Sequence, residues 1–318
     1  MTEPGATQHR TLIVSADAAG MRVDVYLALR FASWSRSAVA KAIREGQVRS
    51  TSRDLKPSSI LGAGETLSLL LPSLAPESPK PACPPLLYED RRVLAFDKSA
   101  GLLAHPTGER FTWGLINLAR ERFPNENLHL LHRLDRETSG VCLLARDPEA
   151  NRFLKLAFKE HQARKTYLAL VRGAPEWDET RLEGPIGDDE ASPIRIKQAV
   201  RPDGQPAATH FLVRERFARL SLVECRPQTG RTHQLRVHLE ALGFPILGDK
   251  IYGQDPAVFL SIFEGNPLED LDARLGHPRH CLHAARLQVP HPDGGELDIE
   301  APLPADMATL LDAARAGA

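Results

Sequence analysis

The hydrophobic pattern from residue 92 onward alternates between short strands and helices. Seven apolar runs have the length and, in many cases, the period-two alternation of strands: 92–98, 129–132, 141–147, 167–173, 209–217, 219–227 and 287–291. Residues 148–162 and 233–243 place apolar side chains at helical spacing, and Asp147 before Pro148 is typical of a helix start. The pattern predicts a mixed domain dominated by sheet.

A smaller module precedes this domain. Residues 23–31 and 35–46 predict two short helices, and the apolar run 67–71 predicts a strand. Six prolines between positions 72 and 85 exclude continuous helix or central strand there. We therefore expect an N-terminal module over residues 1–75, an extended linker over 76–85 and a larger domain over 86–318.

Charge separates the two predicted domains. The whole chain has 318 residues and a formal charge of −1, which excludes a uniformly basic nucleic-acid-binding protein. Residues 20–72 nevertheless contain eight basic and four acidic side chains. This surplus favours local RNA binding, although a solvated helix face would look the same. The candidate RNA-binding residues are Arg22, Arg36, Lys41, Arg44 and Arg49.

Several classes of function lose support. No apolar run approaches the roughly 20 residues of a membrane helix and no signal-peptide pattern opens the chain, so we expect a cytoplasmic protein without membrane contact. The four scattered cysteines suggest reduced thiols. No phosphate-loop, dinucleotide-binding or zinc-peptidase motif occurs. His277, His280, Cys281 and His283 are more typical of satisfied histidines than of a metal site, because alternate strand residues face opposite ways.

Three segments place a reactive polar group beside a turn signal. Asp135 lies on a loop between two apolar strands, where a catalytic group or a turn-forming aspartate would both fit. Tyr167 interrupts an aliphatic strand, as a site residue or a core aromatic would. Arg231 precedes a predicted helix, where the helix dipole disfavours a cation by ~0.3 to 1 kcal/mol unless an anion compensates it. We expect Asp135 or an RNA phosphate to be that anion.

In this order the segments HRLDRETSG, KTYLALV and GRTHQLRVHL resemble the RluA-type family of RNA pseudouridine synthases. KSAGLLAHPT, GQPAATHFLV, LGDKIYG and CLHA extend the similarity over most of residues 86 to about 290. Residues 1–75 are more loosely similar to the small RNA-binding domain of the ribosomal-protein S-four type. The resemblance implies an α+β fold with a mixed, mainly antiparallel sheet, joined to a small α/β RNA-binding domain.

The resemblance also implies an activity and residue roles. The enzyme would detach a uridine base from its ribose, turn it and rejoin it through carbon, with no cofactor or metal. Asp135 would be the nucleophile or base, Tyr167 a stacking and proton-transfer group, and Arg231 the ion partner of Asp135. The residues implied in substrate binding are Arg133, Leu235, His132 and Thr232.

The expected partner is ribosomal RNA, with the large subunit as the first choice and transfer RNA as the second. We expect the enzyme to be a monomer. The alternative is a non-catalytic RNA-binding or ribosome-assembly factor on the same scaffold. We expect such a factor to have lost at least one of Asp135, Tyr167 and Arg231, and all three are present.

Overall fold

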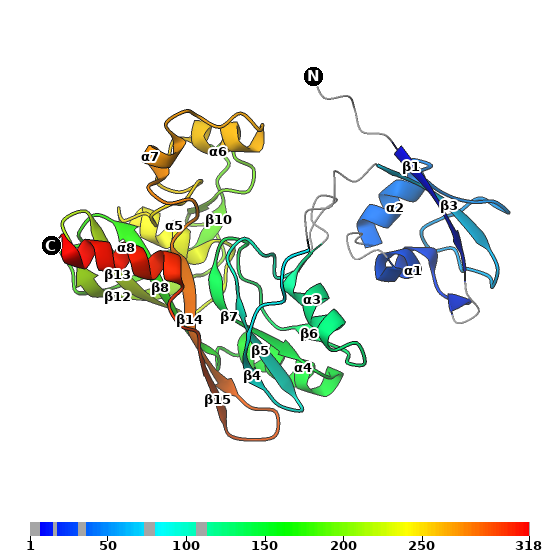
Figure 1. Cartoon of the computed structure of the whole chain (residues 1–318), viewed down its shortest axis with the longest axis horizontal. Coiled ribbons are helices and arrows are strands. Elements are labelled where there is room, and N and C mark those ends of the chain that lie inside the picture. Colours follow the sequence, from blue (N-terminus) through cyan, green and yellow to red (C-terminus); the bar gives the residue numbers. More distant parts are fainter. Residues whose placement is uncertain (1–6, 15–17, 31–35, 73–79, 106–112, 318) are drawn as a thin grey trace. The chain divides into compact units, whose positions relative to one another are not determined.

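The computed structural model describes residues 7–14, 18–30, 36–72, 80–105 and 113–317 (Figure 1). The chain forms two compact units, one from residues 1–83 and 105–122, the other from residues 84–104 and 123–318. The grouping of 105–122 with the N-terminal unit was not expected from the sequence. Four positions of the expected linker, 76–79, lie outside the described residues. The domain limits at 75 and 86 stay a prediction.

Over its described residues, the first unit contains a three-stranded antiparallel sheet in the order β1-β3-β2 and three helices. Its elements are β1 (Thr7–Ile13), α1 (Val23–Arg30), α2 (Arg36–Arg44), β2 (Val48–Ser50), β3 (Thr66–Pro72) and α3 (Leu115–Arg122). Leu67 and Leu69 alternate into the core with Leu27 of α1 and Val39 of α2. The two predicted helices and the predicted strand of this module are confirmed.

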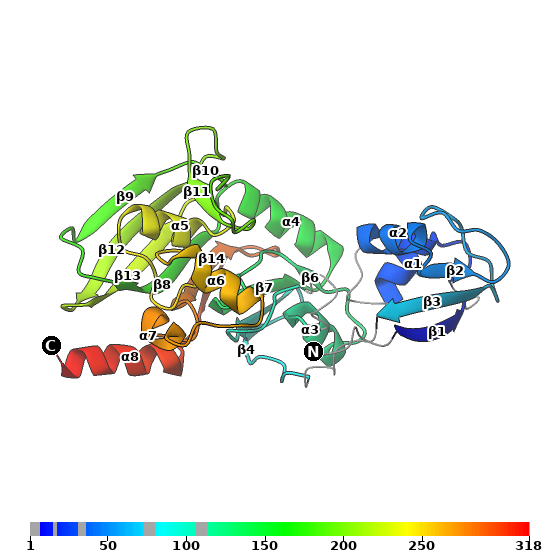
Figure 2. The same ribbon diagram turned by 90° about the horizontal axis from the view of Figure 1, so that it is seen from above.

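The second unit is built on a ten-stranded sheet (Figure 2). Its main path runs β4-β5-β7-β14-β8-β13-β12-β9, while β15 pairs with β14 and β6 with β7. Every pairing is antiparallel except β7 with β14, so the mixed, mainly antiparallel sheet is confirmed. The strands are β4 (Leu86–Glu89), β5 (Val93–Lys98), β6 (His129–Leu130), β7 (Ser139–Ala145), β8 (Arg164–Arg172), β9 (Glu179–Glu183), β12 (Ala208–Arg216), β13 (Leu220–Pro227), β14 (Leu282–Pro290) and β15 (Glu296–Glu300).

A separate two-stranded sheet and five helices complete this unit. They are β10 (Ile186–Asp188), β11 (Gln198–Val200), α4 (Pro148–Lys159), α5 (Gln234–Ala241), α6 (Pro256–Phe263), α7 (Leu271–Leu275) and α8 (Ala305–Ala316). Asp147 caps α4 as predicted, because its carboxylate accepts the backbone N–H groups of Glu149 and Ala150. Leucines of α5 and α8 pack into the same apolar cluster as β8 and β13.

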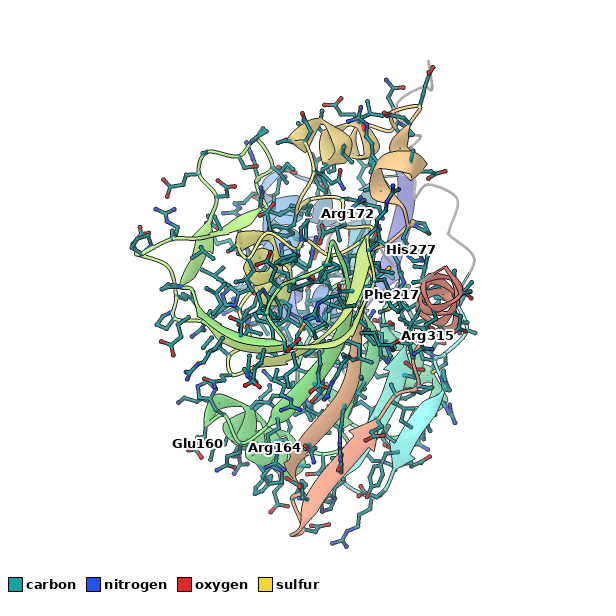
Figure 3. The ribbon with its side chains drawn as sticks, turned by 90° about the vertical axis from the view of Figure 1, so that its left-hand side faces the viewer. Glu160, Arg164, Arg172, Phe217, His277 and Arg315 are labelled. Atoms are coloured by element: carbon teal, nitrogen blue, oxygen red, sulfur yellow. The ribbon has the colours of Figure 1, made fainter. Side chains whose placement is uncertain are left out.

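Strand β8 lies in the middle of the sheet, between β14 and β13. Figure 3 labels its two ends, Arg164 and Arg172. Within it, Tyr167 is opposite Ala284 of β14 and Cys225 of β13, so this side chain starts from the centre of the sheet. The loop that carries Asp135 and precedes β7 lies next to β14, because Ser139 and Gly140 pair with that strand.

Candidate active site

A pocket gathers residues from five parts of the second unit: the loop before β7, strand β8, the end of β13 with the turn that follows, the start of α5, and β14. The lining residues are Arg133, Leu134, Asp135, Thr138, Lys165, Tyr167, Pro227, Thr229, Gly230, Arg231, His233, Gln234, Leu235, Arg236 and Leu282. The structure therefore brings the three polar groups selected from the sequence, Asp135, Tyr167 and Arg231, to one pocket.

The loop that carries Asp135 is fixed at both sides. The N–H of Thr138 donates to the carbonyl oxygen of Asp135 at 3.1 Å, which closes a turn. The ammonium group of Lys98 and the N–H of Gly101 both donate to the carbonyl oxygen of Arg136, at 3.2 and 2.8 Å. These bonds hold the carboxylate of Asp135 on a rigid support, as precise positioning of a reacting group requires.

Two of the histidines after residue 276 form hydrogen bonds with this loop and with the start of β7. The Nε2 atom of His280 is 2.8 Å from the hydroxyl of Thr138, and Nδ1 of His283 is 3.0 Å from the hydroxyl of Ser139. The structure thus assigns both imidazoles to hydrogen bonds with the loop and the start of β7. Among the described residues, no three His, Cys, Asp or Glu side chains gather as metal ligands would.

Close backbone contact explains the glycine that follows the loop. Gly140 has φ 110, in the left-handed half of backbone space. A Cβ atom there would lie 2.2 Å from the carbonyl oxygen of Ala284 in β14. Only glycine lets the two parallel strands approach, so the TSG turn of the sequence sets the distance between the loop and β14.

Asp135 is bound by Arg236, and this corrects the sequence prediction. The Nη1 atom of Arg236 is 3.0 Å from Oδ2 of Asp135. Burial is the largest single effect and raises the pKa of Asp135, but the electrostatic effects of Arg236, His233 and His280 and the hydrogen bond from Arg236 together outweigh it and hold that pKa below its ordinary value. A carboxylate in this setting is ionised at neutral pH.

The expected Arg231–Asp135 ion pair is wrong. Helix α5 begins at Gln234, with His233 as its N-cap, so Arg231 lies three residues before the helix, one more than the pattern suggested. Its Nε atom donates to the carbonyl oxygen of Pro206 at 3.1 Å, and its exposed side chain lies on the pocket lining. The argument from the helix dipole applies instead to Arg236, the third residue of the helix.

A second, deeper carboxylate orients Arg236. The Nε and Nη2 atoms of its guanidinium group donate to Oδ2 and Oδ1 of Asp249 at 2.6 and 2.9 Å, in a two-pronged fork. Asp249 is fully buried and Arg236 is 6% exposed. The guanidinium group also lies over the ring of Tyr252, 4.8 Å from its centroid. Asp249 and Tyr252 come from the LGDKIYG segment, whose spacing alone indicated no role.

Tyr167 lies in the same pocket as Asp135. Burial, and then the negative charge of Asp135, raise the pKa of its phenol above the ordinary value. The hydroxyl is therefore protonated at neutral pH and remains a hydrogen-bond donor. A neutral aromatic ring with this donor suits contact with a flat, polar ligand such as a nucleobase.

Two of the four predicted substrate-binding residues line the pocket and two do not. Arg133 and Leu235 belong to the lining. The ring of His132 stacks on Phe158 at 5.2 Å between centroids, and its Nε2 accepts the N–H of Leu143. This side chain lies outside the pocket lining, and its expected substrate contact stays a prediction. Thr232 is exposed and lies outside the lining.

Lys165, His233 and Gln234 are lining residues that the sequence reading missed. The ammonium group of Lys165 donates to the carbonyl oxygen of Thr229 at 3.1 Å, and burial lowers its pKa. Gln234 accepts the N–H of Arg231 at 3.0 Å and so fixes the turn before α5. Their positions beside Tyr167 and Arg231 in the quoted motifs were the available signal, but one strand or helix pattern does not say which side chains face a pocket.

The five candidate RNA-binding residues of the first unit are all exposed. Arg22 and Arg36 both bind the carboxylate of Asp24, and each of these ion pairs has an N–O distance of 3.0 Å. The other three side chains contact residues within four positions of themselves. Their role in RNA binding stays a prediction.

Comparison with known proteins agrees with this geometry. A family model described as RNA pseudouridylate synthase matches residues 92–241, which include Asp135, Tyr167 and Arg236. Ribosomal large subunit pseudouridine synthase D of Xanthomonas campestris pv. campestris is 37% identical over 322 residues, covering 99% of this chain and 95% of that protein. Ribosomal large subunit pseudouridine synthase C of Escherichia coli (strain K12) is 34% identical over 306 residues, covering 92% and 93%.

Two solved human structures share the fold. RNA pseudouridylate synthase domain containing 4 aligns with a TM-score of 0.58 and 29% identity over 72% of this chain and 92% of that chain. RNA pseudouridylate synthase domain containing 1 aligns with a TM-score of 0.57 and 26% identity over 76% and 98%. The fold and pocket are those of an RNA-modifying isomerase. The chain belongs to the RNA pseudouridylate synthase family, whose members convert uridine in RNA to pseudouridine.

In the described parts of the chain, no helix is long and apolar enough to cross a membrane. The four cysteines are free thiols. Burial raises the pKa of Cys142 to about 12, which makes this thiol inert at neutral pH.

Proposed function

We propose that this protein isomerises specific uridines of large-subunit ribosomal RNA to pseudouridine, with Asp135 as the nucleophile or base. The observation that carries the proposal is a single ionised carboxylate, aligned by a buried arginine and placed in one pocket with a protonated tyrosine. The names of the relatives from Xanthomonas campestris and Escherichia coli support the choice of RNA. Transfer RNA is the second candidate, and the enzyme would act as a monomer in the cytoplasm.

The chemistry fits the residues without an external reagent. The bond between N1 of uracil and the ribose breaks, the base turns, and a bond from C5 of uracil to the same ribose carbon forms. C5 loses a proton and N1 gains one, so atoms and electrons balance within the substrate. Asp135 would attack the sugar or base, or take up a proton, because Arg236 keeps it ionised. Tyr167 would stack on the base and move a proton.

The basic side chains at the pocket suit the flanking RNA backbone. Arg133, Lys165 and Arg231 line the pocket, and none has a carboxylate partner among the described residues. Phosphate groups of a bent, base-flipped strand would supply the missing anions. Arg231, displaced from Asp135, takes this phosphate-binding role in our proposal, and Leu235 adds an apolar wall for the base.

The test is a comparison of wild type with Asp135→Asn on purified large-subunit ribosomal RNA that lacks pseudouridine. We expect wild type to form pseudouridine at defined positions, and the variant to bind the same RNA within about twofold while forming none. The amide keeps the shape of the side chain but loses the charge. Product formation by Asp135→Asn within tenfold of wild type contradicts the catalytic role, and product on transfer RNA alone contradicts the choice of substrate.

A further inference from the structure

His233 connects the carboxylate of Asp135 to the LGDKIYG segment. Its backbone has φ 56, a left-handed conformation that few residues other than glycine and asparagine adopt readily. Its side chain is 12% exposed. On one edge of the ring, Nδ1 is 2.8 Å from the hydroxyl oxygen of Tyr252, and on the other edge Nε2 is 3.9 Å from Oδ2 of Asp135.

The hydrogen bonds of Tyr252 determine where the imidazole carries its proton. The backbone N–H of Gln198 donates to the phenol oxygen at 3.0 Å. Within the described chain, Nδ1 of His233 is then the one acceptor left for the single proton of that hydroxyl. Nδ1 is therefore unprotonated in the neutral ring, and Nε2 carries the proton and points at Asp135.

The charges around His233 support a neutral ring. Arg236 faces the ring from α5, Asp135 faces it from the loop before β7, and Asp249 faces it from the LGDKIYG segment. Burial and then the charge of Arg236 lower the pKa of His233 to about 4, against the smaller effects of the two carboxylates. Near pH 7 the imidazole is thus a neutral donor, and it adds no charge next to Asp135.

We propose that Tyr252 and His233 form a positioning pair for Asp135, in which Tyr252 fixes the neutral ring with its proton on Nε2 and this N–H binds the Asp135 carboxylate once substrate fills the pocket. The proposal rests on the proposed function, in which Asp135 is the reacting group. The 3.9 Å separation is longer than a hydrogen bond. Such bonds are often long in a free enzyme and shorten in the substrate complex. Arg236 supplies the charge, and His233 adds direction without a second cation.

The proton position is measurable directly on the full-length protein. Histidine side chains labelled with ¹⁵N give separate signals for protonated and unprotonated ring nitrogens, and loss of one pair in His233→Asn assigns them. We expect wild type at pH 7 to show an unprotonated Nδ1 and a protonated Nε2. In Tyr252→Phe the two neutral forms should mix. A proton on Nδ1 in wild type, or two ring protons at pH 7, overturns the proposal.

Two substitutions of His233 separate donor position from folding. A glutamine amide reaches the place of Nε2, whereas an asparagine amide reaches only the place of Nδ1. Asparagine is the better residue for a left-handed backbone, so His233→Asn should unfold at no lower denaturant concentration than His233→Gln. Activity should follow the opposite order, because only glutamine can donate to Asp135.

Single-turnover kinetics with saturating enzyme decide the functional part. We expect His233→Asn and Tyr252→Phe to lose at least tenfold in rate constant, with RNA affinity within twofold of wild type, and His233→Gln to recover at least threefold over His233→Asn. Equal rates for the two His233 variants, or a loss confined to RNA affinity, overturn the positioning role. Failure of wild type to make pseudouridine contradicts the proposed function instead, and the ¹⁵N measurement still judges the proton position.

Discussion

The buried fork between Arg236 and Asp249 gives a sharp test of how this site is held together. The substitution Asp249→Asn removes a negative charge from a side chain that is 0% exposed. The Oδ1 atom of Asp249 also accepts the backbone N–H groups of Ile251 and Tyr252, at 2.9 and 3.1 Å. An asparagine oxygen can keep these two bonds, but the amide N–H₂ then faces the Nε–H of Arg236.

The expected cost follows from burial. Removing one partner of a buried ion pair costs about 3–5 kcal/mol, because the remaining charge is left without compensation. Arg236 still has Asp135 at 3.0 Å, so we expect a value near the lower limit, about 3 kcal/mol in the free energy of unfolding. Loss of the Asp249 charge also makes the surroundings of Asp135 more positive, which lowers the pKa of Asp135 further.

A matched control exists on the surface. Arg286 and Asp298 form the same kind of two-pronged pair, but their side chains are 41% and 39% exposed. Asp298→Asn should cost about 0.2–1 kcal/mol, as exposed pairs do. Both variants and wild type would be unfolded in urea at pH 7, and the free energy of unfolding would be taken from the transition of the second unit. If Asp249→Asn costs no more than Asp298→Asn, the reasoning from burial is refuted.

Three further predictions use other parts of the structure. The single-turnover rate of wild type should stay level from pH 8 to about pH 5 and fall only below the ordinary carboxyl range. The reason is that the pKa of Asp135 is lowered, so its charge is lost only as pH falls through that lowered value. A decrease in rate centred near pH 6.5 contradicts this. Gly140→Ala should cost at least about 3 kcal/mol more in urea unfolding than Gly294→Ala, since both glycines have φ of 100 to 110 but only Gly140 meets backbone atoms of β14. Arg49→Gln should flatten the slope of log RNA affinity against log salt by about 0.7 to 0.9 if this exposed side chain contacts a phosphate, and an unchanged slope would remove Arg49 from the interface.

The sequence by itself determined the elements with strong local signals. Short apolar runs predicted β5, β12 and β13, and the Asp147–Pro148 cap predicted the start of α4. These signals are local, because strand alternation and helix capping depend on residues within a few positions. Short or polar elements gave weaker patterns, so β9, β10 and β11 were not expected, and the longer helix α8 was missed as well.

The candidate site shows the same division. Asp135 and Tyr167 could be selected from the sequence because each is a polar residue that interrupts an apolar strand context, and the pocket contains both. The dipole argument was sound in principle but led to Arg231, because the sequence does not show which arginine near the start of α5 contacts Asp135.

Only the tertiary structure decided the partners of Asp135. The bonds from Asp249 to Arg236 and from Tyr252 to His233 join α5 to a turn 13 to 19 residues away in sequence, and Arg236 then reaches a loop 101 residues earlier. No periodicity within either segment encodes these distances. They are set by how β7, β8 and β14 pair and by the packing of α5 against the sheet, and these bring the side chains together only in the folded chain.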